Sequence, residues 1–358
     1  MDIPNINTIH ILYKKGHDSL KTSFFSFKFS PDYLSAVGYF TDAGKGYKKL
    51  KLFNESIRAF NEAIKCNKEL HESWAQGQNY KEIAEIYLYD LNNFEEGWKN
   101  LQNSCLSLKI AGKFTSGVKV YQDFAEKSIE LQKHDQALIF LKQAIDDCFE
   151  HTHDELVRIS LEEVFNKLID VYSYLKKYED AIILTEKYIK IQKSIKNEPK
   201  HKISKNYLKL GMLRIIIDEI YMAESIVDDM FSVYDSSCAE DIEDLKKLIK
   251  SFKELNKKDF NYLIVYAFSL FSNNLLKALR NVFEAKLQLN QNVNYEGNTN
   301  VNRNVIFVDR ILPTDLSNIS MNETNVNSEV NVEFDNQNEG NNFNHNESNN
   351  RTNADDYM

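Results

Sequence analysis

The length, composition and charge of the chain exclude several classes of protein. Its 358 residues exceed the roughly 250 to 300 at which a single hydrophobic core stops growing, so we expect two domains or one elongated repeat array. Only 11 Gly and 4 Pro accompany 22 Phe and 19 Tyr, which disfavours collagen-like and turn-rich β-sandwich folds and predicts a helical body. Of the net charge of −9, residues 1–290 carry only −1 (42 acidic and 41 basic side chains), a balance that argues against nucleic-acid binding.

The first 25 residues give no sign of a secretory signal. Their Lys and His residues follow the apolar positions instead of preceding them, the reverse of the order in a signal peptide. The four cysteines form no CxxC pair and so suggest a reducing compartment. The longest apolar run, residues 263–271, has nine residues, whereas a membrane-spanning helix needs about 20. We therefore expect a cytoplasmic chain whose contact with membranes is peripheral.

Four phenylalanines are crowded into a loop that follows the first predicted helix. Residues 21–31 contain Phe24, Phe25, Phe27 and Phe29. Exposing each ring costs about 1.5 to 3 kcal/mol relative to burial, so a loop of this kind is usually covered. Either the rings pack onto the first helical hairpin, or they enter the headgroup boundary of a membrane while Lys21 and Lys28 meet anionic lipid. Both interpretations stay open at this point.

Upstream of residue 233 the sequence repeats about every 40 residues. When five blocks are aligned, one position is occupied in turn by Phe53, Phe94, His134, Tyr178 and Ile220. The intervals between these residues are 41, 40, 44 and 42 residues. Each block is an apolar-periodic helix, a short polar turn and a second helix with a small residue, such as Ala137 or Ala181, near the start of its inward face. Such units must stack to cover their apolar faces. We therefore predict an all-α solenoid of helical hairpins, a right-handed twisted sheet of antiparallel helices that resembles tetratricopeptide (TPR) repeats with lengthened helices.

The pattern changes after Ser232. Residues 233–290 predict three or four shorter helices, which we expect to form a small bundle that caps the array. From residue 291 onward 20 of 68 residues are Asn, and the few apolar side chains cannot offset the entropy of ordering the chain. The predicted organisation is a hairpin array at 1–232 that includes a hydrophobic loop at 22–31, a helical bundle at 233–290, and an Asn-rich, disordered acidic tail at 291–358.

No constellation of residues points to catalysis. The chain lacks a phosphate-binding GxxxxGKS/T loop, and residues 44–46 (Gly-Lys-Gly) fall inside a predicted helix. The nearest approach to a metal site is the group Cys148, His151, His153 and Asp154. This group has no second ligand pair elsewhere, and a polar connector between two repeats explains it better. We expect no enzymatic activity, no cofactor and no bound metal.

Several motifs, taken in their order along the chain, resemble one protein family. They are the stretch at 20–63 that contains FSPDYLSAVGYF, AGKFTSGVK at 111–119, YLKKYEDAI at 174–182, SKNYLK at 204–209 and LKKLIKSFKELNKKDF at 245–260. Over residues 5–290 the chain is similar to the soluble NSF attachment proteins, or SNAPs. The run FSPDY at 29–33 is more similar to the gamma branch of that family.

Members of that family are adaptors of intracellular vesicle traffic, including transport between endoplasmic reticulum and Golgi, and have no catalytic activity. The resemblance implies that this chain binds the four-helix SNARE bundle left after membrane fusion and recruits the hexameric ATPase NSF, which pulls the bundle apart. It also implies a location on the cytosolic face of vesicle, Golgi or vacuolar membranes. By the same resemblance, the family's membrane-attachment loop falls on Phe24, Phe25, Phe27 and Phe29.

The resemblance also assigns residues to the two protein partners. SNAREs would be gripped by basic side chains on the inner face of the hairpin sheet, here Lys113, Lys119, Lys167 and Lys205. NSF would be contacted by the last helix, at Leu279, Glu284 and Leu287. Glu163 and the pair Ala239 and Glu240 stand where alpha-type members tend to be basic, so we expect weaker binding of SNAREs or a different partner.

A general scaffold of helical repeats is the alternative function. Such a protein docks partner peptides through Lys and Asn side chains that clamp a carboxylate in one narrow groove, and it has no use for a Phe-rich loop. The irregular period of 40 to 44 residues favours the SNAP-like adaptor over a scaffold with a strict period of about 34 residues.

Overall fold

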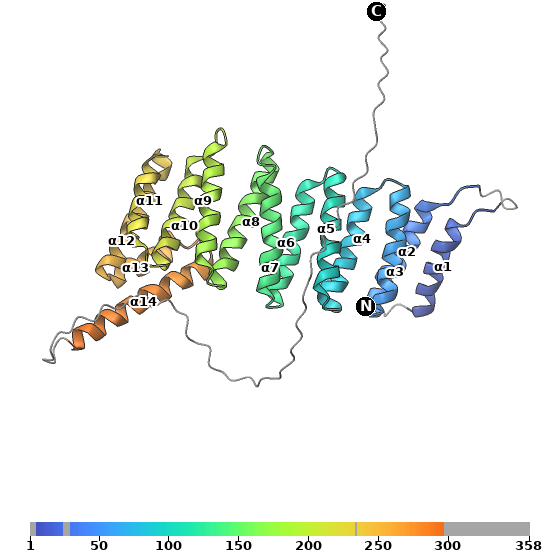
Figure 1. The fold of residues 1–358 in the computed structure, drawn as a ribbon, viewed down its shortest axis with the longest axis horizontal. Helices are drawn as coiled ribbons and strands as arrows, with labels where there is room; N and C mark the ends of the chain where they lie inside the picture. Colours follow the sequence, from blue (N-terminus) through green and yellow to red (C-terminus); the bar gives the residue numbers. More distant parts are fainter. Residues whose placement is uncertain (1–4, 24–28, 233–234, 297–358) are drawn as a thin grey trace, which may run out of the picture. The chain divides into compact units, whose positions relative to one another are not determined.

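The computed structural model describes residues 5–23, 29–232 and 235–296, and the regular secondary structure of these ranges is helical (Figure 1). The described residues belong to one compact unit. Its array contains α1 (Ile6–Leu20), α2 (Tyr33–Lys49), α3 (Phe53–Glu69), α4 (Ser73–Glu85), the π-helical turn η1 (Ile86–Asp90), α5 (Phe94–Ile110), α6 (Phe114–Glu130), α7 (His134–Phe149), α8 (Glu155–Tyr174), α9 (Tyr178–Ser194), α10 (Lys200–Ile216) and α11 (Ile220–Ser232). The C-terminal elements are the 3₁₀ turn η2 (Ser236–Cys238), α12 (Ala239–Glu254), α13 (Lys257–Tyr262), the π-helical turn η3 (Leu263–Ala267) and α14 (Asn273–Glu296).

The predicted solenoid of hairpins is confirmed. The position that the sequence repeats align is the first residue of the second helix in each hairpin, because α3, α5, α7, α9 and α11 begin at Phe53, Phe94, His134, Tyr178 and Ile220. Helix α2 pairs with α3, α4 with α5, and so on to α10 with α11, while α1 packs on α2. Figure 1 shows α1 to α11 side by side in chain order. The chain is therefore an all-α, TPR-like array.

A small residue lies three positions after the start of each second helix. The five are all buried: Ser56, Gly97, Ala137, Ala181 and Ala223. Ser56 donates from its Oγ to the backbone O of Gly44 on α2 at 2.8 Å, and a Cβ added to Gly97 would lie 2.4 Å from Leu88 Cγ. The column of small residues predicted around Ala137 and Ala181 thus lets the two helices of a hairpin approach closely.

The turns inside the hairpins share one backbone conformation. Two positions before each second helix φ lies between +50° and +65°, at Lys51, Asn92, Gln132, Lys176 and Asp218. In the turn between α8 and α9, the Lys177 N–H donates to the Tyr172 O at 2.9 Å, which is the hydrogen bond that closes a helix in the Schellman motif. Among the described residues with positive φ, only Gly112, before α6, is a glycine.

Replacing Lys176 with Gly is expected to raise the free energy of unfolding by about 0.5 to 1 kcal/mol, because a residue with a Cβ is strained at positive φ and glycine is not. Gly112→Ala is expected to lower it by about 1 kcal/mol for the same reason. Urea unfolding followed by circular dichroism measures both variants. Effects of the same sign would show that backbone strain does not govern these turns.

The C-terminal elements pack back onto the array. Helix α14 contacts α8 and α10, and its first turn is held by Asp170 of α8. Asp170 Oδ2 accepts from Asn274 Nδ2 at 2.9 Å, and Oδ1 accepts from the hydroxyl of Ser272. Helix α14 continues to Glu296, inside the range predicted to be the tail. Within the described residues, no helix is long and apolar enough to cross a membrane.

Candidate partner-binding face

One face of the array carries a lattice of lysine–carboxylate pairs. It runs over the first helices of successive hairpins, from α2 through α4, α6 and α8 to α10, and each pair joins two neighbouring helices of this set. The pairs are Lys48 with Glu82 and Glu85, Lys127 with Glu85, Lys81 with Asp123, Lys167 with Glu126, and Lys202 with Glu162. We call this surface the ion-pair face.

The spacing of these charges follows the repeat. Four of the pairs join residues that are 40 to 42 positions apart, because stacked repeats bring equivalent positions side by side. Burial raises the pKa of Glu85, but hydrogen bonds from Lys127 and Lys48 outweigh this effect, and the pKa is lowered. Half-exposed pairs of this kind contribute only about 0.2 to 1 kcal/mol each. Many weak ion pairs therefore join the helices of this face, and a competing charge from outside can displace one partner of any pair.

Three of the four lysines predicted to bind SNAREs lie on consecutive first helices, α6, α8 and α10. Lys119, Lys167 and Lys205 have 56%, 30% and 44% of their side chains exposed, and each is paired within the chain, with Asp123, Glu126 and Asp241 respectively. Lys113 is exposed in the turn before α6. The face thus offers cations that are already neutralised by neighbouring acids.

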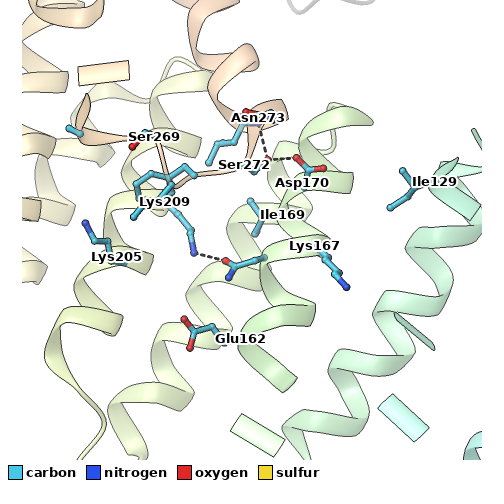
Figure 2. Close-up of a pocket in the computed structure, with 15 residues that line it drawn as sticks. Ile129, Glu162, Lys167, Ile169, Asp170, Lys205, Lys209, Ser269, Ser272 and Asn273 are labelled. Carbon is cyan, nitrogen blue, oxygen red and sulfur yellow. Dashed lines mark hydrogen bonds between the residues drawn. The ribbon is translucent and has the colours of Figure 1, made fainter. Parts of the chain in front are cut away.

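The ion-pair face ends in a cavity where the C-terminal elements fold back. Helices α8 and α10 and residues 267–275 line this open cavity of about 660 Å³, which contains Lys167, Lys205 and Lys209 (Figure 2). Lys205 Nζ lies 2.6 Å from Oδ1 of the almost buried Asp241. Lys209 extends from α10 toward α8, as Figure 2 shows. The sequence analysis quoted the motif that contains it but assigned it no role.

The surroundings of Lys209 are mostly uncharged. Its Nζ lies 5.0 Å from the ring centroid of Phe165 and 5.8 Å from that of Phe271. Burial lowers the pKa of Lys209 to about 8; Glu162 acts in the opposite direction and Lys205 in the same one. A signal was present in the run SKNYLK, because residues four apart on a helix share one side and Lys209 follows Lys205 by four.

A family comparison covers the array and its ion-pair face together. The family model described as "Soluble NSF attachment protein, SNAP" matches residues 9–274, from within α1 to the start of α14. The chain belongs to the SNAP family. A search of curated protein sequences finds no match. Among solved structures, the crystal structure of BtubC (BKLC) from P. vanneervenii is 13% identical, with 64% of this chain and 89% of that chain covered and a TM-score of 0.31.

In this SNAP-family chain the loop predicted for membrane attachment is described only in part. Phe24, Phe25 and Phe27 lie outside the described residues. Phe29 is 68% exposed, and Leu34, in the first turn of α2, is 76% exposed. The Asp32 N–H donates to the Ser19 O at 3.0 Å and so joins α1 and α2 at the base of the loop. Exposed apolar surface therefore continues from the end of the loop onto α2.

The three residues predicted to contact NSF have different surroundings on α14. Leu279 is 0% exposed and packs in the core. Leu287 is partly buried against that core, and Glu284 Oε1 lies 3.1 Å from Lys257 Nζ. Glu284 and Leu287 are therefore accessible to a partner, whereas Leu279 fixes α14 in place.

The group of possible metal ligands around Cys148 is not assembled into a site. Cys148 is fully buried, and burial raises the pKa of its thiol to about 12, which opposes the thiolate form that binds metals. The His151 ring packs on Phe114, with centroids 4.3 Å apart. In the described ranges, no group of three or more His, Cys, Asp or Glu side chains could hold a metal ion.

Proposed function

We propose that this SNAP-family chain is a gamma-like cytoplasmic adaptor that binds SNARE bundles and recruits the hexameric ATPase NSF, so that the bundles are taken apart after membrane fusion. The observation that carries the proposal is the family match over residues 9–274, because that range contains the whole ion-pair face. Stacked hairpins also offer a long continuous surface, which suits an elongated partner.

On this proposal, lysines of the ion-pair face exchange partners when an acidic SNARE bundle docks. Breaking a half-exposed internal pair costs little, and a new pair with the bundle compensates for it. Salt screens such contacts, so the complex should weaken markedly as ionic strength rises. Because acids alternate with lysines on the face, we expect only moderate affinity.

Replacing Lys119, Lys167 and Lys205 together with Ala is expected to weaken SNARE-bundle binding about tenfold, because three charge contacts are lost at once. The matched control changes Lys99, Lys187 and Lys250 to Ala, which removes the same charge from exposed sites outside this face. Titration of the immobilised bundle with each variant gives the dissociation constants. Equal weakening by both triple variants would place the contact elsewhere.

The double substitution Phe24→Ser and Phe25→Ser is expected to abolish most binding to anionic liposomes, because each ring contributes about 1.5 to 3 kcal/mol when it leaves water. The control is Leu106→Ser with Ile183→Ser, two apolar residues of the array that are 55% and 64% exposed. Flotation with liposomes measures both. Retained flotation of the Phe24/Phe25 variant would defeat the attachment role of the loop.

For the contact with NSF we propose Glu284 and Leu287 on α14, with Leu279 supporting the helix from inside. The decisive experiment for the whole proposal is a disassembly assay that contains SNARE bundles, NSF and ATP, with and without this chain. Disassembly that depends on the chain is the expected result. If the chain binds neither bundles nor NSF, the adaptor proposal fails.

The general-scaffold alternative keeps one observation in its favour. It requires Lys and Asn side chains in one groove, and Lys205, Lys209 and Asn166 line the same cavity. The disassembly assay separates the two functions, because a general peptide scaffold would not stimulate NSF on SNARE bundles.

A further inference from the structure

Among the described residues, Lys209 has fewer hydrogen-bond acceptors around its ammonium group than it has N–H donors. An ammonium group carries three N–H donors. Asn166 Oδ1 accepts one at 2.7 Å and Asn206 Oδ1 accepts another at 3.1 Å. Within the described part of the chain, the third N–H has no acceptor, and no carboxylate oxygen lies within 4 Å of Lys209 Nζ. The cation is thus held by two neutral amides.

The other charged groups that line the cavity are engaged. Lys205 is paired with Asp241, Lys167 with Glu126, and Glu162 with Lys202. The carboxylate of Asp170 accepts hydrogen bonds at the start of α14. Of the lysines that line this cavity, Lys209 is therefore the one without an acidic partner among the described residues.

The rest of the lining is suited to an apolar group. Its apolar residues are Leu270, which is exposed, and Ile169 and Phe271, which are almost buried. Ser269 and Asn273, from the segment that leads into α14, add polar groups (Figure 2). The volume of about 660 Å³ lies in the range of about 300 to 1,000 Å³ that is usual for small-molecule sites. A desolvated cation beside an apolar wall favours a ligand that combines an anionic group with an apolar body.

We propose that this cavity binds a small organic oxyanion, a molecule that carries a phosphate or carboxylate group on an apolar body, with Lys209 as the cation that holds the anionic group. The ligand's oxygen accepts the third N–H of Lys209, and its apolar body packs on Ile169, Leu270 and Phe271. This inference does not depend on SNARE or NSF binding.

The test uses phenyl phosphate and benzoate as probes and phenol as the neutral control, each titrated calorimetrically into the full chain. We expect either or both anions to bind and phenol to bind at least tenfold more weakly, since hydrogen bonds to charged groups are the stronger ones. The stronger of the two anions identifies phosphate or carboxylate as the preferred group. Lys209→Met should weaken binding of the anion about tenfold or more. Lys200→Met, which changes an exposed lysine at the start of the same helix, should leave the affinity unchanged.

A pH series on the unmodified chain tests the same site without a substitution. Lys209 loses its charge near its lowered pKa of about 8, so the affinity for the anion should fall between pH 7 and pH 9.5. A phosphate monoester has its second pKa near 6 and keeps its charge throughout. The groups that line the cavity around Lys209 are Glu162, Lys167 and Asp170 from α8 and Lys205 from α10, while residues 267–275 add none that titrate. Absence of binding, a flat pH profile or equal affinity of Lys209→Met would overturn the proposal.

Discussion

Phe140→Ala is expected to lower the free energy of unfolding by about 3 to 5 kcal/mol, the usual effect of removing a buried aromatic ring. Phe140 lies in α7 and is 0% exposed. Its ring centroid is 6.1 Å from that of Phe94, 5.6 Å from that of Trp98 and 6.3 Å from that of Phe124. The ring therefore joins α5, α6 and α7, and its removal leaves a cavity between two hairpins. Urea unfolding measures the loss.

The neighbouring residue Ile139 provides the control for this substitution. Ile139 is 41% exposed, and Ile139→Ala should cost less than about 1 kcal/mol because no closed cavity forms. Circular dichroism reports the whole array, and tryptophan fluorescence reports the hairpin of α4 and α5, which carries Trp74 and Trp98 and packs on Phe140 through Trp98. The two signals therefore show whether the repeats unfold together. Similar losses for both variants would mean that Phe140 is not a packing centre.

Sequence reasoning predicted the hairpins well because their positions recur. Phe53 and its four counterparts mark the first residue of a helix in each repeat, and a buried small residue follows three positions later. Five copies of one pattern reduce the chance that any single helix boundary is misjudged. The left-handed turn residues, such as Lys51 and Gln132, gave no comparable signal, because almost any residue type occupies them at a modest cost.

The ion-pair face was foreseen only in part: of its paired lysines, the sequence analysis named Lys167 alone. Its acids were missed because each partner stands one repeat away, as with Glu126 and Lys167 or Glu162 and Lys202. A comparison of charges at equivalent positions in adjacent repeats would have found these pairs. Their presence changes the interpretation of the proposed binding, which then depends on an exchange of partners between paired charges and not on attraction to an unbalanced positive field.

The C-terminal contacts lay beyond sequence reasoning for a different reason. Asp170 and Asn274 are 104 residues apart, and no repeat relates them. The apolar stripe of α14 was recognisable, but the choice between a partner-binding role and a core role for Leu279 depends on which side of the helix meets α8 and α10. That side is settled by the docking of α14, and Leu279 lies in the interior.

Asp170→Ala is expected to loosen α14 while the hairpin array stays folded. Asp170 accepts hydrogen bonds from Ser272 and from the backbone and side chain of Asn274, and hydrogen bonds to charged groups are worth about 1.5 to 3 kcal/mol each. Amide hydrogen exchange in α14 should therefore become about 10 to 100 times faster, since about 1.4 kcal/mol corresponds to a factor of ten. Exchange measured by mass spectrometry on peptides from α14 and from α6 shows whether the effect is local.

Two further variants on α8 make this test specific. Asp170→Asn keeps the shape of the side chain but not its charge, so the exchange rate in α14 should fall between that of the native chain and that of Asp170→Ala. Glu163→Ala changes an exposed position of the same helix and should leave the exchange rate in α14 unchanged. If α14 carries the contact with NSF, Asp170→Ala should also reduce NSF recruitment while binding of SNARE bundles to the ion-pair face persists, because that face is built mostly from α2 to α10. Unchanged exchange in α14 would show that the packing of Leu275, Leu279 and Phe283, which are all 0% exposed, holds the helix without Asp170.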